Sequence, residues 1–271
     1  MKFDLSKIKF SRFDLKRGLK LPIKLSEELA EDIGIMVGDG HISSHRYGTR
    51  TSNEVAISCN SITDKDYIIH HVKKLKLGLY NLNFQVFYVG KNKTEIRLGI
   101  SSLGLIEFYN KIIGLPLGKK ENIKIPLLIK NSDNKVKCAF IRGLADTDFT
   151  LTFRKKDRKL MYYPLIKINS ASKNLIKDIN EILISLDFKT TTSYDLESLH
   201  SLTKRISISS ELSLNGRDNL KRWMRIIGFS NPKNNLKYNL WKKQGFCPRD
   251  YEIRNIMKKW AQRDSNPRPQ D

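Results

Sequence analysis

The sequence predicts an α+β protein built from two similar halves related by a pseudo-twofold axis. The first observation is a pair of apolar helical stretches, LAEDIGIMVGDGHI at residues 29–42 and AFIRGLADTDFTL at residues 139–151. The second is that each stretch ends at an acid, Asp39 or Asp148, and these acids are 109 residues apart. The third is that helical and strand-like segments follow each stretch in the same order. Duplication of one unit explains all three observations.

Small residues mark one face of each of these two helices. Gly34 and Gly38 lie one turn apart on the first, and Gly143 and Thr147 lie one turn apart on the second. Small side chains allow the backbone of another helix to approach closely. We therefore predict that the two helices pack against each other through these four residues, at the centre of the molecule.

The elements of the first half follow from caps and periodicity. Ser26 is the expected N-cap of the first helix, with Glu27 and Glu28 in its first turn, where the helix dipole favours acids. Residues 55–60 alternate between apolar and polar side chains, as in a half-buried strand. The other predicted elements are a helix over 63–77, strands over 84–89 and 94–100, and a helix over 102–113 that ends at Gly114.

The second half repeats this order. Its predicted elements are the motif helix, a charged hairpin over 151–170, a helix over 173–186, strands over 188–194 and 205–209, and a helix over 217–227. Two sequence echoes accompany the repeat. RLGISS at 97–102 resembles RISISS at 205–210, an offset of 108 residues, and IIGLP at 112–116 resembles IIGFSNP at 226–232, where the two glycines are 114 residues apart.

Composition narrows the class of partner. The chain has 271 residues, with 50 Lys and Arg against 28 Asp and Glu, and a net charge of +22. Such a charge favours a polyanion, with nucleic acid as the first candidate and an anionic membrane surface as the second. No apolar run approaches the roughly 20 residues that cross a bilayer, and no secretory signal is recognisable. We expect an intracellular protein, cytoplasmic and associated with the nucleoid if the source is prokaryotic.

The three cysteines do not form a recognisable site. Cys59, Cys138 and Cys247 are widely spaced and include no CxxC pair. Neither a disulfide framework nor a cysteine-based zinc site is expected.

The predicted boundaries divide the chain into five segments. They are a basic N-terminal arm at 1–25, a first half at 26–114, a linker at 115–133, a second half at 134–245, and a basic extension and tail at 246–271. The arm carries eight Lys or Arg residues within residues 1–24 and is either a nucleic-acid-binding arm or a mobile terminus. A short basic helix is expected over 251–260.

The last residues, QRDSNPRPQD, have two explanations. They are polar and rich in proline, as in an ordinary disordered tail. The peptide Asp-Ser-Asn-Pro is also one reading of the antisense strand of the T-loop of transfer RNA genes, which would suit a mobile element lodged beside such a gene.

The paired acids indicate a metal site. If the two motif helices pack about the pseudo-twofold axis, Asp39 and Asp148 come together at the negative ends of two helix dipoles. This repulsion requires a cation, and carboxylate oxygens suit a hard divalent ion, Mg²⁺ or another such as Mn²⁺. Two carboxylates holding metal ions could support phosphodiester hydrolysis.

The outward faces of the strands are the candidate nucleic-acid surface. Antiparallel strands packed on helices along one face leave a polar face that fits the major groove of DNA. The side chains that we expect on this face are Arg97, Arg154, Lys167, Asn169, Arg205, Ser207 and Ser209.

The two motifs resemble those of single-chain LAGLIDADG homing endonucleases. DIGIMVGDG at 32–40 and IRGLADTDF at 141–149 align with the nine-residue motif, and the resemblance covers about residues 26–245. It implies two αββαββα halves whose sheets form a saddle over a long double-stranded DNA site. It also implies that Asp39 and Asp148 bind catalytic divalent metals, with the backbone carbonyls of Gly40 and Phe149 as further ligands. The resemblance implies a monomer that cleaves DNA site-specifically.

Three features depart from the family pattern. Phe149 stands where the motif has glycine, and Asp32 replaces an apolar residue at the first motif position. The family often keeps a Lys or Gln near the strand end before the second helix of each half, but here these regions read CNS at 59–61 and NSAS at 169–172. A charge stabiliser for the site is therefore not assigned.

A basic structural protein without a site is one alternative, but it leaves the duplicated acids unexplained. Two other functions fit the same scaffold. One is a maturase that binds intron RNA, and the other is a DNA-binding regulator without cleavage. The presence of both acids favours the nuclease, since a pure binding protein does not need them.

Overall fold

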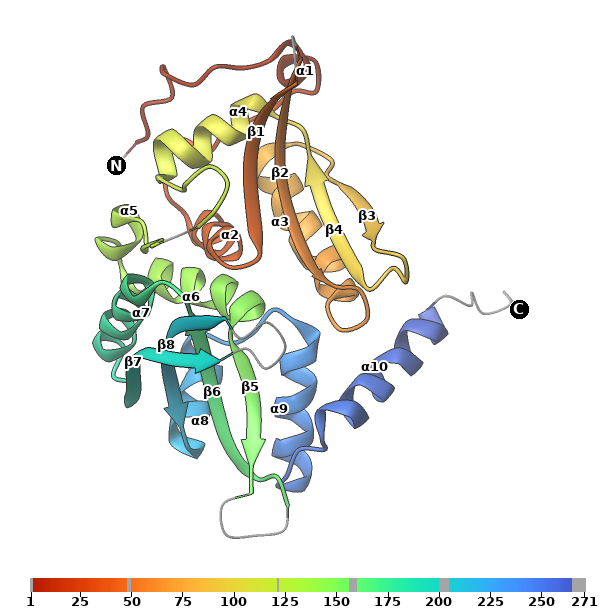
Figure 1. The fold of residues 1–271 in the computed structure, drawn as a ribbon, viewed down its shortest axis with the longest axis vertical. Helices are drawn as coiled ribbons and strands as arrows, with labels where there is room; N and C mark the ends of the chain where they lie inside the picture. The colour runs from red at the N-terminus through yellow and green to blue at the C-terminus, as the bar shows by residue number, and fades with distance from the viewer. Residues whose placement is uncertain (1, 48–49, 121, 156–159, 200–204, 265–271) are drawn as a thin grey trace.

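The computed structural model describes residues 2–47, 50–120, 122–155, 160–199 and 205–264 (Figure 1). It contains two four-stranded antiparallel sheets, each covered by helices on one face. The strands are β1 (Gly40–Tyr47), β2 (Arg50–Asn60), β3 (Gln85–Val89) and β4 (Glu95–Ile100) in one sheet, and β5 (Thr150–Arg154), β6 (Tyr163–Ser170), β7 (Thr190–Leu199) and β8 (Ile206–Asn215) in the other.

The helices complete the same plan in each half. The first half has α1 (Arg12–Lys16), α2 (Glu27–Val37), the π-helical η1 (Tyr67–Val72) continuing into α3 (Lys73–Tyr80), and α4 (Leu103–Glu107) continuing into the π-helical η2 (Phe108–Ile113). The second half has α6 (Asn134–Asp148), α7 (Lys173–Ser185), α8 (Arg217–Ile226), α9 (Pro232–Gln244) and α10 (Asp250–Asp264), preceded by the short α5 (Leu127–Lys130).

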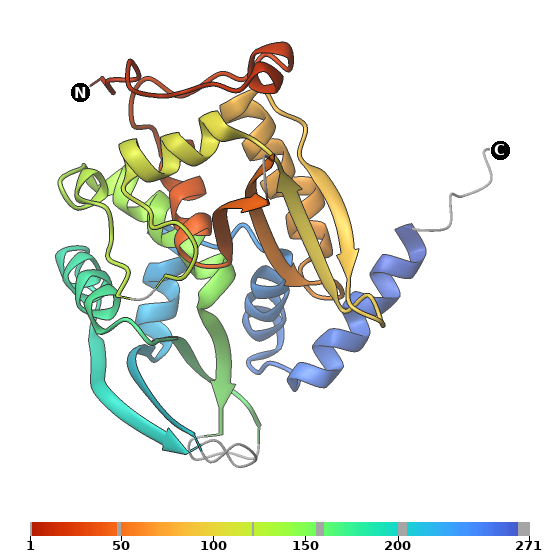
Figure 2. The same cartoon turned by 45° about the horizontal axis from the view of Figure 1, so that its top comes forward.

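The two sheets have the same topology, which confirms the predicted duplication. Their strand orders are β1-β2-β4-β3 and β5-β6-β8-β7, so each strand of the first sheet has a counterpart at the same place in the second. All the pairings are antiparallel. The predicted α+β class and the central position of the motif helices are confirmed as well (Figures 1 and 2).

The similarity between RLGISS at 97–102 and RISISS at 205–210 matched residues that are not structural counterparts. Ser102 is the N-cap of α4 and Gly216 occupies the same place before α8, 114 residues later. The offset in this region is therefore 114, so Glu211 is the counterpart of Arg97. The offset of 108 had matched Arg205 to Arg97. Arg205 instead lies just before β8, next to the segment that joins the two strands of the β7–β8 hairpin, whereas Glu211 lies in the middle of β8. A bulge in β7, between Ser193 and Leu196, adds length to this hairpin.

Caps define where the two motif helices begin. Ser26 Oγ accepts a hydrogen bond from the Leu29 amide, as the sequence predicted. Asp133 has the same role for α6, where its Oδ1 accepts from the Val136 amide at 3.0 Å. Each cap satisfies a backbone N–H that the first turn of a helix leaves without a partner.

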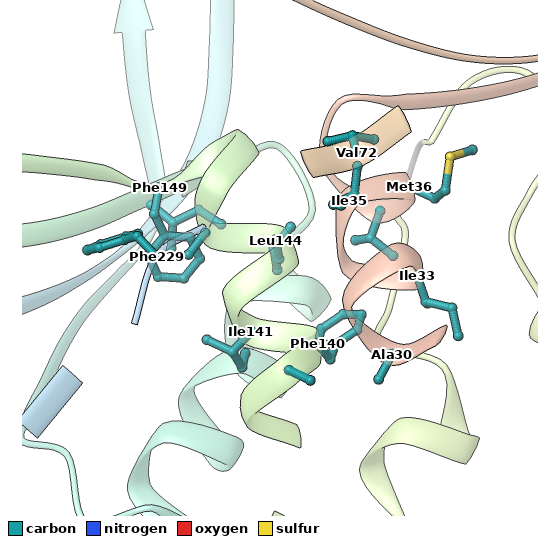
Figure 3. Close-up of a cluster of buried hydrophobic side chains, with 14 of the residues drawn as sticks. Ala30, Ile33, Ile35, Met36, Val72, Phe140, Ile141, Leu144, Phe149 and Phe229 are labelled. Atoms are coloured by element: carbon teal, nitrogen blue, oxygen red, sulfur yellow. The ribbon is translucent and has the colours of Figure 1, made fainter. Parts of the chain in front are cut away.

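The motif helices pack with almost no space between their backbones. A Cβ atom added to Gly34 would lie 2.1 Å from Phe140 O, and one added to Gly143 would lie 2.0 Å from Glu31 O. Larger residues flank this contact: Figure 3 shows Phe140 and Leu144 of α6 directed towards α2. The glycines thus allow two buried helices to lie in backbone contact.

Polar groups at the same interface connect the two halves. Glu31 of α2 accepts hydrogen bonds from Arg142 of α6, with Arg142 Nη2 at 2.7 Å, and from Ser230 Oγ at 2.9 Å. Its other close neighbour is His71 Nε2, at 2.7 Å. Burial opposes ionisation of Glu31, but hydrogen bonds from His71 and Arg142 lower its pKa to about 2. The buried carboxylate therefore remains charged and holds residues from both halves.

Asp32, which departs from the motif, is neutralised inside the first half. The side chain is fully buried and accepts from Lys76 Nζ at 2.7 Å and from Tyr80 Oη at 2.6 Å. Tyr109 Oη donates to the same carboxylate at 2.5 Å. The charge at the first motif position is therefore satisfied by three buried partners from α3 and η2.

The basic N-terminal segment packs against the first half instead of extending from it. Asp14 of α1 is buried and accepts hydrogen bonds from Ser102 Oγ at 2.6 Å and from the Gly104 amide at 3.1 Å. Ile8 is buried as well. Most of the segment's basic side chains remain exposed.

The segment at 115–133 is a packed connection. It contains α5, and Ile123, Ile125 and Ile129 are buried in the common core. Asp178 of α7 accepts hydrogen bonds from the Ile125 amide and from Lys130 Nζ. The connection therefore contacts the first half near Gly118 and Lys120 and the second half from Ile123 onwards.

The C-terminal extension contains the predicted basic helix, α10, over a longer range than expected. The tail at 265–271 lies outside the described residues. Within the described ranges, no helix has the length and apolar character needed to span a membrane.

Candidate active site and DNA-facing surface

The two motif acids lie at neighbouring helix ends. Asp148 is the last residue of α6, and Asp39 follows Gly38, the C-cap of α2. A Cβ added to Gly38 would lie 2.0 Å from Thr147 Oγ1 and 3.0 Å from Asp148 Oδ1. The packing of the small residues therefore brings the end of each helix against the other.

Both acids hold their protons more tightly than an ordinary aspartate. Burial, and after it the charge of Asp39, raises the pKa of Asp148 to about 7, although the nearby Lys120 opposes this. Burial is also the main cause of the raised pKa of Asp39, and the charge of Asp64 adds to it. A bound cation would relieve these effects because it favours the ionised forms of both groups.

Lys120 supplies a positive charge at this site and comes from the connection between the halves. Its Nζ donates hydrogen bonds to the carbonyls of Val37, at 2.9 Å, and Met36, at 3.2 Å, and it also contacts the carbonyl of Gly38. It thereby caps the C-terminal end of α2, where the helix dipole is negative. Burial lowers the pKa of Lys120, and the charges of Asp148 and Asp39 oppose that effect.

A second lysine approaches the site from the other half. Lys233, in the first turn of α9, donates to Asp64 Oδ1 at 2.8 Å. Its positive charge opposes the rise in the pKa of Asp39 that burial causes. Asn231 Nδ2 also donates to Asp64 Oδ1, at 2.7 Å. Lys120 and Lys233 each follow the last helix of the αββαββα unit in their half, so both halves supply a lysine from the same region of the fold.

Cys59 occupies a strand end where the family often has Lys or Gln. Its Sγ donates to Asp39 Oδ2 at 3.3 Å. Burial raises the pKa of this thiol, and the charges of Asp39 and Asp64 add to the effect. Cys59 is therefore a neutral donor to the acid, and the positive charge of the site comes from Lys120 and Lys233 instead.

The residue after each acid has a different environment. Gly40 begins β1, where an added Cβ would lie 2.4 Å from Met36 Cα, so only glycine fits this position. Phe149 is only 4% exposed, and its ring lies 5.6 Å from that of Trp223, centre to centre. Figure 3 shows it beside Phe229, directed away from α2. Its side chain belongs to the core of the second half, and its backbone has an extended conformation.

The donor set fits a hard divalent cation. The carboxylates of Asp39 and Asp148 are half-buried and lie in each other's electrostatic field, and both would offer oxygen atoms to a metal ion. Among the described residues, no group of three or more His, Cys, Asp or Glu side chains is arranged to hold a metal ion. A site with only two protein carboxylates would leave metal coordination positions for substrate oxygens and water.

Strand register places the predicted DNA-facing residues of the second half on one face. Lys167 and Asn169 alternate along β6 with buried Ile168, and Asn169 lies opposite Glu211 of β8. Residues that pair across antiparallel strands share a face. The predicted residues on this face of the strands are Arg154, Lys167, Asn169, Ser207 and Ser209, with Arg205 exposed just before β8.

Acids partly neutralise the basic residues of both sheets. Lys167 Nζ lies 2.5 Å from Glu211 Oε2 in the second sheet. In the first sheet, Arg97 Nη2 donates to Glu54 Oε2 at 2.7 Å. Arg97 lies opposite Ser58 and Phe87, on the face away from the buried Leu98. These ion pairs hold the long side chains in place on the two sheet faces.

Sequence reasoning did not find Lys120, Lys233 or Asp64 as site residues. The connection at 115–133 looked like a linker because it contains prolines and lysines. One signal was present: each lysine follows a repeated IIG segment, at 112–114 and 226–228. The 114-residue offset of these segments also separates Lys119, the neighbour of Lys120, from Lys233.

Comparison with known proteins gives one family and several relatives. Residues 135–228 match the LAGLIDADG-like domain family. The chain is 31% identical over 135 residues to an A-type ATP synthase protein of Pyrococcus abyssi, covering 49% of this chain and 12% of that protein. It is 27% identical over 226 residues to the replication factor C small subunit of Methanocaldococcus jannaschii, covering 76% of this chain and 10% of that protein. The chain thus spans about a tenth of each of these relatives.

Solved structures share the fold of most of the chain. The homing endonuclease I-DmoI in complex with DNA and Ca aligns with a TM-score of 0.52 at 21% identity, over 74% of this chain and 88% of that one. I-LtrWI, a LAGLIDADG homing endonuclease bound to target DNA, aligns with a TM-score of 0.51 at 11% identity, over 86% and 97%. I-DmoI is also known in complex with DNA and Mn, and a point variant of it with its target DNA in the presence of Mg. These likenesses establish the two-half fold.

Proposed function

The chain belongs to the LAGLIDADG family in its single-chain form, and we propose that it is a homing endonuclease that cuts both strands of a long DNA site. The observation that carries this proposal is the pair of half-buried acids that meet at the ends of α2 and α6, beside two lysines. A protein that only binds DNA or RNA has no need to hold two repelling, half-buried carboxylates against each other at its central helix interface.

Asp39 and Asp148 are the residues that would hold divalent metal, with the carbonyls of Gly40 and Phe149 as additional oxygen ligands. When bound, Mg²⁺ or Mn²⁺ would stabilise the attacking and leaving oxygens of phosphodiester hydrolysis. The structures of I-DmoI with Ca, Mn and Mg support a divalent cation. The raised pKa of Asp148, about 7, implies that metal competes with a proton at this group, so metal binding strengthens as pH rises through 7.

Lys120 and Lys233 are the groups that we assign to charge stabilisation. The charges of both lysines act on Asp39, Lys120 from the connection and Lys233 from the second half. Lys120 is held by three carbonyls at the end of α2, so its charge is positioned before substrate arrives. Preorganised positive charge of this kind favours the extra negative charge of a phosphoryl transition state.

The two sheet faces are the proposed surface for DNA. Residues 26–114 and 134–245 form the two halves, joined by 115–133, and one chain therefore supplies the whole saddle as a monomer. The net charge of +22 supplies attraction to the phosphate backbone. The side chains that we assign to DNA contact are Arg97, Arg154, Lys167, Asn169, Arg205, Ser207 and Ser209.

The experiment is cleavage of a duplex that spans the empty insertion site of the gene, in Mg²⁺ or EDTA. Wild type should cut both strands in Mg²⁺ only, whereas Asp39→Asn and Asp148→Asn should bind the duplex in Ca²⁺ and leave it intact. Asp187→Asn is the matched control, because this carboxylate is 84% exposed and pairs with Arg222, at the outer end of α7. Binding by wild type without cleavage would indicate the regulator, and undiminished cleavage by the double variant would reject the metal site.

A further inference from the structure

A polar cavity lies beside the end of α6 that carries Asp148. Its volume is about 200 Å³, far above the roughly 10–15 Å³ that one water needs. It is bounded by the end of α6, the start of β5, the first half of α9 and the first turn of α10. The C-terminal extension thus forms one wall, through Asp250, Ile253 and Arg254.

Most of the charged residues that line this cavity are cationic. Lys233, Lys237 and Arg254 line it, together with the carboxylate of Asp250, while Lys233 is paired with Asp64 outside the lining. Lys237 Nζ lies 2.8 Å from Asp250 Oδ1 and donates to Leu151 O at 3.0 Å, so this pair is held in place. Arg254 is exposed and has no ion-pair partner among the described residues. The unpaired positive charge of Arg254 favours an anion in the cavity over a metal ion.

Asn234 adds a donor whose partner is missing. The residue lines the cavity and is only 1% exposed, yet its Nδ2 finds no hydrogen-bond partner within the described part of the chain. Buried amide donors are nearly always paired in folded proteins. An oxygen-bearing ligand in the cavity would satisfy this group together with the neighbouring cations.

The position of the cavity connects it to the DNA surface. Thr147 and Phe149, which flank the acid Asp148, both line it. Thr150 also lines it and lies opposite Lys167, on the sheet face that we assign to DNA. A strand whose phosphodiester lies at the acid pair would therefore pass beside this opening.

We propose that this cavity binds a backbone phosphate of the DNA strand that crosses the acid pair, with Arg254 and Asn234 as its specific contacts. The proposal rests on the proposed function, because it takes DNA as the ligand. It assigns a role to the C-terminal extension: Ile253 and Met257 are buried and fix α10 in place, so that Arg254 is presented to the cavity.

The test is the salt dependence of duplex binding by the full chain, measured by fluorescence anisotropy in Ca²⁺ so that no cleavage is required. Arg254→Gln removes the proposed contact. Lys258→Gln is the matched control, because Lys258 is exposed one turn further along α10 and does not line the cavity. Each phosphate contact contributes about 0.9 to the slope of log K against log salt. We expect the slope to fall by about 0.9 for Arg254→Gln and to stay unchanged for Lys258→Gln.

Two further measurements keep the outcome decisive. Asn234→Leu removes the unpaired amide and should weaken duplex binding without lowering the melting temperature. Orthophosphate, compared with chloride at equal ionic strength, should raise the melting temperature of wild type and Lys258→Gln more than that of Arg254→Gln.

The proposal would be overturned if wild type and both α10 variants show the same salt slope of duplex binding. It would also be overturned if Arg254→Gln and Lys258→Gln lower that slope equally. A third contrary outcome is that orthophosphate raises the melting temperature less for Arg254→Gln than for wild type while the salt slope of DNA binding is the same for both proteins. That result would assign the cavity to free phosphate and would also overturn the proposal. A wild type that shows the expected slopes but never cleaves would reject the endonuclease and leave this phosphate site standing.

Discussion

Gly143→Ala should destabilise the protein through the contact between the two motif helices. The new Cβ would lie 2.0 Å from Glu31 O and 2.9 Å from Glu31 C, both of them rigid backbone atoms. Ordinary contact begins at 3.4 Å, so α2 and α6 must separate by about 1 Å or more at this point. Overpacking of a tight core costs roughly 1–3 kcal/mol and occasionally more, against a helix-propensity gain of about 1 kcal/mol for alanine. Because the clash is with rigid backbone, we expect a net loss towards the upper end of the difference, about 1–2 kcal/mol.

Gly78→Ala is the control for this prediction. Gly78 is an exposed residue in α3, and an added Cβ there meets nothing within 4 Å. The same substitution should therefore stabilise the protein by about 0.5–1 kcal/mol. Urea unfolding at 25 °C measures both changes. Equal effects of the two substitutions would refute the close backbone contact.

Three other substitutions probe the acids and their surroundings. In EDTA, the pKa of Asp148 in the folded protein, about 7, lies above its unfolded value near 3.8, so this carboxyl lowers stability as pH rises from about 4 to 7. Asp148→Asn should then raise the melting temperature at pH 8 but hardly at pH 4, and an equal gain at both would contradict the assignment. Arg142→Met leaves Glu31 buried with fewer partners, which should cost about 2–3 kcal/mol in urea unfolding at pH 7. Because the pKa of Glu31 is about 2 in the folded protein, that cost should diminish as pH falls from 4.5 towards 2, and a cost independent of pH would exclude Glu31 as its source. Phe149→Gly restores the family residue but empties a core position beside Trp223, so we expect a loss of about 4 kcal/mol in urea unfolding and no gain in cleavage rate; a stable, faster variant would show that Phe149 impairs the site.

Local signals in the sequence predicted most of the secondary structure. Ser26 caps α2, and Gly114 ends η2 in the left-handed conformation, because both roles depend on one residue type at one place. The alternation of residues 94–100 correctly placed Ile96 and Leu98 in the core. The motif helices and their contact were predictable because small residues repeat on one face of each helix.

Long-range features could not be read from the same signals. Strand register depends on pairing between distant segments, so the RISISS echo suggested the wrong counterpart for Arg97. Nothing local predicts that Lys120 turns back to the end of α2, because its hydrogen bonds go to carbonyls more than 80 residues earlier. The burial of Asp32 beside Lys76 likewise depends on a contact between elements.

Cleavage of duplex DNA in Mg²⁺ by the double variant Asp39→Asn/Asp148→Asn tests the paired acids most directly. If these acids hold the catalytic metal, the rate should fall at least about 1,000-fold below wild type while binding in Ca²⁺ persists. A double variant that cleaves at the wild-type rate would contradict the assignment of this site.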